Sequence, residues 1–94
     1  MDNLDVPSEV VADKDSREVL RCWVANEGLV CALRPTNWTD SSAWGIVLAD
    51  VARHIANALQ EERGDDPAAT ISKIRELFSA EFDAPTDEPT GHFY

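Results

Sequence analysis

Two side chains capable of acid–base chemistry, Asp50 and His54, lie four residues apart in a segment whose pattern predicts a helix. At this spacing the carboxylate can orient the imidazole as a general base, and Arg53 on the same polar face could hold an anion. Asn57 completes the polar group. Because no nucleophile or oxyanion donor can be assigned to this group, we interpret it as a solvated helix face with a local ion pair.

Metal binding would need a third ligand beside Asp50 and His54. His92 could supply this ligand only if the C-terminal tail folds back onto the helix. The four glycines are isolated along the chain, so there is no glycine-rich loop to hold a phosphate-bearing cofactor. We therefore expect no metal, no cofactor and no enzymatic activity.

The helix that carries this polar group is apolar around much more of its circumference than a small domain requires. The large apolar residues are Trp44, Leu48, Val51, Ile55 and Leu59, and a neighbouring stripe of small residues comprises Gly45, Ala49, Ala52 and Ala56. The apolar arc spans roughly 200°, whereas a surface helix needs about 100°. Such a helix must bury two faces, which predicts a homodimer. The small stripe would pack either against the partner or against the protein's own sheet.

Local signals mark where the helices begin and end. Asp40, Ser41 or Ser42 can cap the first helix, which we expect to end near Glu62, before Gly64. A second helix should follow at once, with Asp65 or Asp66 as its cap and Pro67 in its first turn. Its apolar stripe comprises Ile71, Ile74, Phe78 and Phe82, with Leu77 on the flank.

Two segments rich in strand-forming residues, 19–25 and 29–34, predict a β-hairpin around Gly28, which can adopt the positive φ angle of a tight turn. We prefer a two-residue Glu27-Gly28 loop to a three-residue loop that also includes Asn26. One sheet face then carries Leu20, Cys22, Val24, Cys31 and Leu33, and the other carries Val19, Arg21, Trp23, Ala25, Val30, Ala32 and Arg34. On this second face Trp23, Val30 and Ala32 form an apolar patch that we interpret as an interface.

The hairpin also decides how Cys22 and Cys31 are related. The two-residue loop makes them diagonal neighbours on one face, and the three-residue loop places them on opposite faces. Neither arrangement sets the cysteines directly opposite each other, as a simple cross-strand disulfide prefers. We therefore expect reduced, partly buried thiols without a nucleophilic role.

The order of these elements predicts an α+β fold, a β-hairpin followed by two α-helices (ββαα). We expect dimerisation to complete it, because a lone hairpin leaves its edges unpaired. Residues 16–83 should form one domain, after a flexible acidic lead-in at 1–15 in which 10–12 could add a short strand. Residues 84–94 form a Pro/Thr-rich tail that ends in Phe93-Tyr94 and either docks into a groove or stays frayed.

Three separated segments, LRCWVAN (20–26), AWGIVLAD (43–50) and PTDEPTG (85–91), carry a family resemblance. In order and spacing they are similar to an uncharacterised group of bacterial proteins of roughly this length, described as a domain of unknown function. The resemblance covers about residues 16–94. It implies a small cytoplasmic bacterial protein and brings no established activity or site residues with it.

The net charge is −10, and the acidic residues gather towards the two ends of the sequence around a neutral middle. Such a field repels phosphate backbones, so we expect no direct binding to nucleic acid. No apolar run approaches the ~18 residues of a membrane span. The acidic start at residues 1–6 lacks the basic and apolar regions of a signal peptide, so we expect a cytoplasmic location.

These patterns predict a non-enzymatic, homodimeric interaction or scaffold protein. One alternative is an acidic module that occupies a basic protein partner in the way DNA would. A less favoured alternative is a small-ligand or metal-binding protein that uses the Asp50/His54 face. The salt dependence of binding distinguishes the interaction protein from the acidic module. Screening weakens binding between opposite charges and hardly affects an apolar contact.

Overall fold

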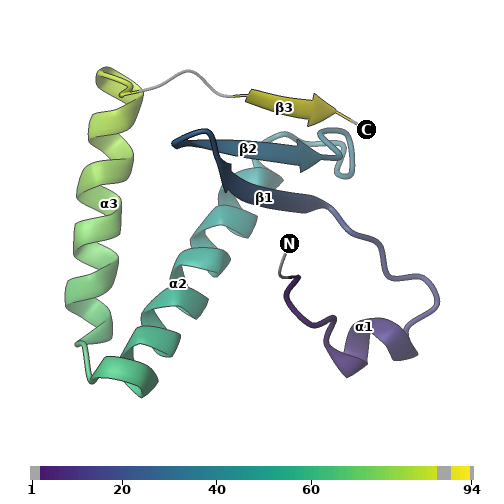
Figure 1. Cartoon of the computed structure of the whole chain (residues 1–94), viewed down its shortest axis with the longest axis horizontal. Helices are drawn as coiled ribbons and strands as arrows, with labels where there is room; N and C mark the ends of the chain where they lie inside the picture. Colours follow the sequence, from purple (N-terminus) through teal and green to yellow (C-terminus); the bar gives the residue numbers. More distant parts are fainter. Residues whose placement is uncertain (1–2, 87–89, 94) are drawn as a thin grey trace. The chain divides into compact units, whose positions relative to one another are not determined.

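The computed structural model describes residues 3–86 and 90–93, the second stretch by its backbone. Its elements follow the order α1 (Ser8–Ala12), β1 (Leu20–Ala25), β2 (Gly28–Leu33), α2 (Ala43–Arg63), α3 (Pro67–Asp83) and β3 (Thr90–Phe93) (Figure 1). The predicted α+β order, a hairpin followed by two helices, is confirmed. The chain divides into two compact units, residues 1–37 with 90–94 and residues 38–89.

The first unit is built on a three-stranded sheet with β2 in the centre. β1 pairs with β2 in antiparallel orientation, and β3 pairs with β2 in parallel orientation. A parallel pair needs a long connection, and the sequence between β2 and β3 supplies it. This third strand was not predicted, and residues 10–12, considered as a short strand, belong to α1 instead. Tyr94 and the side chain of Phe93 lie outside the described part of the chain.

The hairpin turn consists of Asn26 and Glu27, whose φ angles are both positive, 53° and 64°. Ala25 pairs with Gly28, the first residue of β2, so both loops predicted around Gly28 are wrong. Positive φ at both central residues gives the turn the twist of the flanking strands, and Asn tolerates this conformation better than most residues. The ladder is displaced by two positions from the preferred prediction. Such a displacement preserves the alternation of side chains, so the predicted division between the two faces is confirmed.

Glu27 adopts a backbone conformation that suits glycine better. Glu27→Gly is expected to raise the free energy of unfolding by about 0.5–1 kcal/mol, because it relieves a left-handed non-glycine residue while making the unfolded chain more flexible. Urea unfolding followed by circular dichroism measures this gain. Glu27→Ala is the matched control, since it removes the carboxylate and keeps the strain; an equal gain in both variants would assign the effect to charge.

The second unit consists of α2, α3 and the segment leading into them. Gly64 ends α2 in the left-handed conformation, φ 75°, and its N–H donates to the carbonyl of Gln60 at 2.9 Å. Asp66 caps α3 by accepting a hydrogen bond from the N–H of Ala69 at 3.3 Å, and Pro67 is the first helical residue. These predicted helix boundaries are confirmed.

The start of α2 differs in detail from the prediction. Ser42 occupies the N-cap position, but its side chain makes no capping hydrogen bond. Instead, the carboxylate of Asp40 accepts from the backbone N–H of Ser42 at 2.9 Å and from its hydroxyl at 2.8 Å. These hydrogen bonds lower the pKa of Asp40 below its ordinary value. Asp40 therefore stabilises the turn that precedes the helix rather than capping the helix itself.

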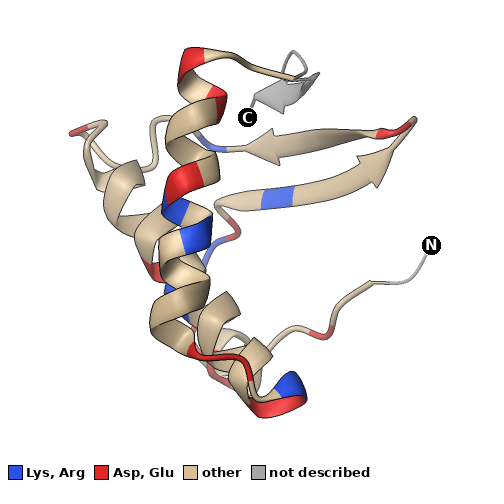
Figure 2. Cartoon of the chain, turned by 90° about the vertical axis from the view of Figure 1, so that its left-hand side faces the viewer, with Lys and Arg blue, Asp and Glu red and all other residues tan. Residues whose placement is uncertain are grey.

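Neither unit encloses much apolar surface. Among the described residues, Ala56 on α2 is the one buried hydrophobic side chain, with 1% exposure. The two helices lie close at their connection and diverge from there (Figure 1). On α3 the two basic residues precede the acidic residues, which continue to the C-terminal end of the helix (Figure 2). The apolar residues of the helix pair are therefore left largely open to solvent.

Candidate functional site

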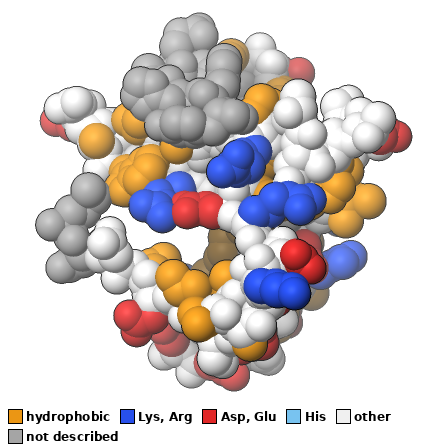
Figure 3. Space-filling model, turned by 90° about the vertical axis from the view of Figure 1, so that its right-hand side faces the viewer, with side chains coloured by type: hydrophobic (Ala, Val, Ile, Leu, Met, Phe, Trp, Pro, Cys, Tyr) orange, Lys and Arg blue, Asp and Glu red, His pale blue; other side chains and the backbone are white. Residues whose placement is uncertain are grey.

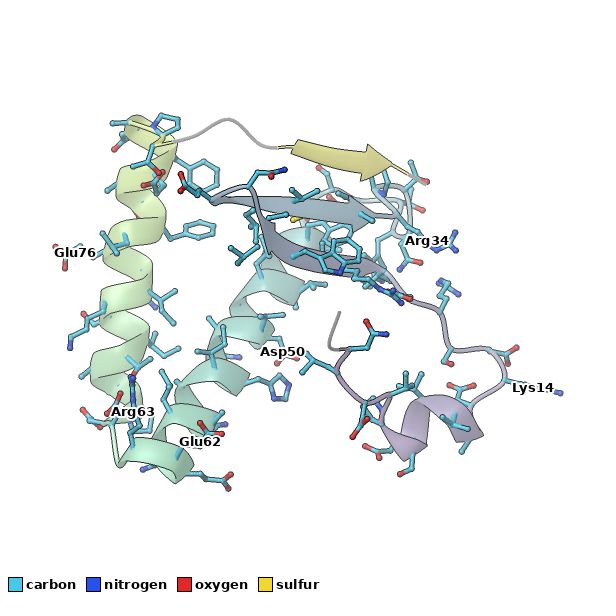
Figure 4. The ribbon with its side chains drawn as sticks, viewed as in Figure 1. Lys14, Arg34, Asp50, Glu62, Arg63 and Glu76 are labelled. Atoms are coloured by element: carbon cyan, nitrogen blue, oxygen red, sulfur yellow. The ribbon has the colours of Figure 1, made fainter. Side chains whose placement is uncertain are left out.

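The polar group on α2 lies at the surface. Asp50, labelled in Figure 4, places Oδ2 3.6 Å from Nε2 of His54, and the two side chains are 66% and 78% exposed. Arg53 and Asn57 line a shallow, open hollow beside the start of α3. The predicted contact between carboxylate and imidazole is thus present, but water screens it strongly. The arrangement offers a surface contact between a carboxylate and an imidazole, and no enclosed space for a substrate.

The proposed third metal ligand, His92, lies in β3, where the backbone alone is described. Within residues 3–86 and the backbone of 90–93, no group of three potential ligands occurs. The metal-binding alternative therefore stays a prediction.

The second sheet face carries Trp23, Val30 and Ala32, as predicted, together with two arginines. Trp23 pairs with Val30, and Arg21 pairs with Ala32, so their side chains lie side by side. The guanidinium of Arg21 lies 5.8 Å from the centre of the Trp23 ring, within the range of a cation–π contact. A hollow on the sheet is lined by Arg21, Trp23 and Ala32, but not by Val30. Its other lining residues are Glu18, Val19, Leu20, Leu33 and Arg34.

Electrostatics in this hollow centre on Glu18. Its carboxylate binds the guanidinium of Arg21 through two contacts, one of them 2.7 Å between Nη2 and Oε2. The Nε of Arg34 donates to the backbone carbonyl of Glu18 at 3.1 Å, and Arg34 is labelled at the end of β2 in Figure 4. The hydrogen bond from Arg21 lowers the pKa of Glu18, and the same bond raises the pKa of Arg21. Because Glu18 neutralises Arg21, the hollow is a weak site for an added anion.

This group of charged residues was not recognised from the sequence as a unit. Alternation along the strands does place Arg21 and Arg34 on the face of Trp23, which is the signal that could have revealed it. Figure 3 shows Lys and Arg side chains beside hydrophobic ones on the face turned towards the viewer. The patch is therefore less apolar than the predicted interface.

The cysteines contradict the prediction directly. Cys22 and Cys31 are paired partners in the ladder, and their Sγ atoms lie 2.8 Å apart. Both predicted registers excluded this pairing because they placed Gly28 in the turn. Cys22 is exposed rather than partly buried, and Cys31 is half-buried. Desolvation, together with the interaction with Cys31, raises the pKa of Cys22 to about 11.

The small-residue stripe of α2 is divided between two environments. Ala56 is buried and Ala52 is half-buried, whereas Ala49 and Gly45 are exposed. Ala56 lines the hollow together with Pro67, Ala68 and Ile71 at the start of α3. The C-terminal half of the stripe therefore packs within the protomer, against a helix that we had not predicted as its neighbour. The N-terminal half is open.

A substitution at Gly45 tests whether the N-terminal half of the small-residue stripe is free of contacts. A Cβ at this position meets nothing within 4 Å, so Gly45→Ala is expected to stabilise α2 by about 0.5–1 kcal/mol through helix propensity. Thermal unfolding measures this change. Gly64→Ala is the control. Because the φ angle of Gly64 is 75°, this substitution should lower the free energy of unfolding by about 1 kcal/mol. If Gly45→Ala instead lowers the free energy of unfolding, a partner backbone approaches Gly45 closely.

Large apolar side chains remain exposed on both helices. Apart from Ile46, which is 74% exposed near the start of α2, those on α2 are Leu48, Val51 and Ile55, with exposures of 42%, 43% and 45%. Those on α3 are Leu77, Phe78 and Phe82, with 69%, 47% and 73%. We call these six residues the helical apolar surface. The two phenylalanine rings contact each other edge to face, with centroids 4.8 Å apart. The pair makes part of this surface aromatic, as interaction surfaces commonly are.

In the described part of the chain, no helix is long and apolar enough to cross a bilayer.

Comparisons with known proteins agree with the resemblance noted in the sequence. The family model "Domain of unknown function (DUF5076)" matches residues 3–86. The chain is also similar to a solved structure from the photosynthetic bacterium Rhodopseudomonas palustrus, of a protein provisionally assigned as a pyruvate dehydrogenase. The two are 33% identical over 96% of this chain and 92% of that chain, with a TM-score of 0.74. No curated protein matches.

Proposed function

The chain belongs to the DUF5076 family of domains of unknown function, and from this premise we propose that it acts as a homodimeric interaction module without enzymatic activity. The observation that carries the proposal is the helical apolar surface. Each of its six residues is at least two fifths exposed, while among residues 3–86 Ala56 is the one buried hydrophobic residue. Full burial of one such side chain is worth about 1.5–3 kcal/mol, so the surface is a strong drive towards association.

A second copy of the chain suits this surface. Two helices cannot enclose a core, whereas two helix pairs packed around a twofold axis form a four-helix bundle. In a twofold interface each patch meets its own equivalent, so an apolar patch is automatically complementary in character. A dimer of this kind would cover apolar residues that the helix pair by itself leaves open.

The net charge of the chain opposes dimerisation and makes the dissociation constant depend on salt. Each chain carries −10, so two copies repel each other. Added salt screens the repulsion, and the dimer should tighten as ionic strength rises. The alternative function, an acidic module that binds a basic protein, predicts the reverse dependence because salt screens its attraction.

Activity as a pyruvate dehydrogenase is not favoured for this chain. Oxidation of a 2-oxo acid depends on cofactors that carry the difficult chemistry. The four glycines are isolated in the sequence, and the Asp50–His54 pair is open to water. With pyruvate, thiamine diphosphate, coenzyme A and NAD⁺ together, we expect no NADH above the protein-free control. NADH formation in proportion to the protein added would overturn the non-enzymatic proposal.

Light scattering after size exclusion tests the dimer. We expect a mass near twice 10.4 kDa over a hundredfold dilution, and a dissociation constant that falls as salt is raised. A mass of one chain at every concentration would overturn the proposal. Dimers that weaken with added salt would show that charged contacts, rather than the helical apolar surface, hold them together.

A further inference from the structure

The paired cysteines have a geometry in which a disulfide can form and be reduced. The N–H of Arg34 donates to the carbonyl of Val19 at 3.0 Å, which marks these two residues as a hydrogen-bonded pair of the ladder. Hydrogen-bonded and non-hydrogen-bonded pairs alternate in antiparallel strands, so the Cys22–Cys31 pair, three positions further on, is of the non-hydrogen-bonded kind. Such pairs hold their Cα atoms about 4.5 Å apart, within the range of a disulfide.

We propose that Cys22 and Cys31 form a reversible dithiol–disulfide site that exchanges with small disulfides such as oxidised glutathione. The Sγ atoms are 2.8 Å apart with the thiols free, so closing the bond requires little movement of the strands. The site is a property of the hairpin and does not depend on the proposed dimer.

A small reagent can reach the pair. Cys22 is exposed, and the neighbouring pair on the same face, Val24 and Leu29, leaves 84% and 58% of its surface open. On the other side of Cys31, β3 places Gly91 at the paired position, and glycine has no side chain to obstruct the approach. The thiols therefore lie among apolar neighbours at a surface, where a glutathione-sized molecule can approach.

The exchange proceeds in two balanced steps. The thiolate of one cysteine attacks a sulfur of oxidised glutathione, which forms a mixed disulfide and releases one glutathione thiolate. The second cysteine loses its proton to solvent, and its thiolate attacks the cysteine sulfur of the mixed disulfide, releasing the second glutathione. Two protein thiols are oxidised to one disulfide, and one small disulfide is reduced to two thiols.

The test equilibrates the full-length chain in buffers with increasing ratios of oxidised to reduced glutathione. After an acid quench and alkylation of free thiols, mass spectrometry separates the dithiol, the mixed disulfide and the internal disulfide. We expect an internal disulfide within single chains. The ratio of oxidised to reduced glutathione at which it forms should be at least about tenfold lower than for the same chain unfolded in concentrated urea.

The double variant Cys31→Ala/Leu33→Cys is the matched control. It keeps two thiols on the same face of the same strands but makes them diagonal neighbours, about 7–8 Å apart at Cα, which is beyond disulfide reach. We expect this variant to accumulate mixed disulfides with glutathione instead. Equal oxidation of folded and unfolded chains, ready internal oxidation of the control, or a covalent dimer in place of the internal bond would each overturn the proposal.

Discussion

Replacing Ile55 by glutamate is expected to dissociate the dimer while leaving the helices folded. Ile55 is 45% exposed in the protomer, so the new carboxylate stays in contact with water once the chains separate. In a twofold dimer each substitution acts twice, because both copies contribute the residue. Dimerisation can bury only the exposed 45% of Ile55, which is roughly half of the ~1.5–3 kcal/mol of full burial, so the loss summed over two copies raises the dissociation constant by at least about tenfold. Light scattering over a dilution series measures this change, and circular dichroism follows the helix content.

Gln60→Glu is the matched control for this experiment. It adds the same charge to α2 at an exposed position outside the stripe of large residues. The control should keep the mass of a dimer. A dimer that survives Ile55→Glu would place the interface elsewhere, and dissociation of both variants would indicate general charge repulsion. If Ile55→Glu unfolds the chain, Ile55→Ala separates the two effects, since it weakens association without introducing a charge.

Introducing glutamate at Ala56 should have a different consequence, the unfolding of the helix pair itself. Ala56 is 1% exposed and lies beside Pro67, Ala68 and Ile71. An unpaired carboxylate forced into such a position costs on the order of 3–5 kcal/mol. This is a large part of the stability of a small domain, about 5–15 kcal/mol. Thermal unfolding at several protein concentrations measures the loss, which should be present even in dilute, monomeric samples.

The same substitution at Ala49 is the control, because this residue belongs to the same small stripe but is exposed. Ala49→Glu should unfold at a temperature close to that of the unmodified chain. If Ala56→Glu is tolerated as well, the two helices do not pack through this residue. If Ala49→Glu lowers the mass without unfolding the chain, the open half of the stripe belongs to the dimer interface.

Much of the local structure could be predicted because its causes lie within a few residues. Gly64 ends α2, and Asp66 with Pro67 begins α3, through backbone groups of the same turn. The polar group at Asp50 and His54 follows equally directly from helical spacing. Strand alternation assigned the side chains of the hairpin to the correct faces.

The pairing of Cys22 with Cys31 could not be predicted in the same way. Three loops are compatible with the Asn26-Glu27-Gly28 sequence, and two of them preserve the same alternation while shifting every partner by two positions. The preference of glycine for positive φ favoured the wrong loop, because the structure places Asn26 and Glu27 in that conformation instead. Which cysteine faces which is decided by the ladder as a whole.

The sequence by itself therefore determined the helices α2 and α3, the hairpin and the excess of apolar surface on α2, since caps and periodicity act over one or two turns. The tertiary structure decided how that surface is divided, with Ala56 against α3 and Ile55 open to solvent. It also decided that β3 joins β2 in parallel, and that two thiols meet across the hairpin. These outcomes depend on contacts between residues far apart in the chain or on a choice of register, and neither leaves a local signal in the sequence.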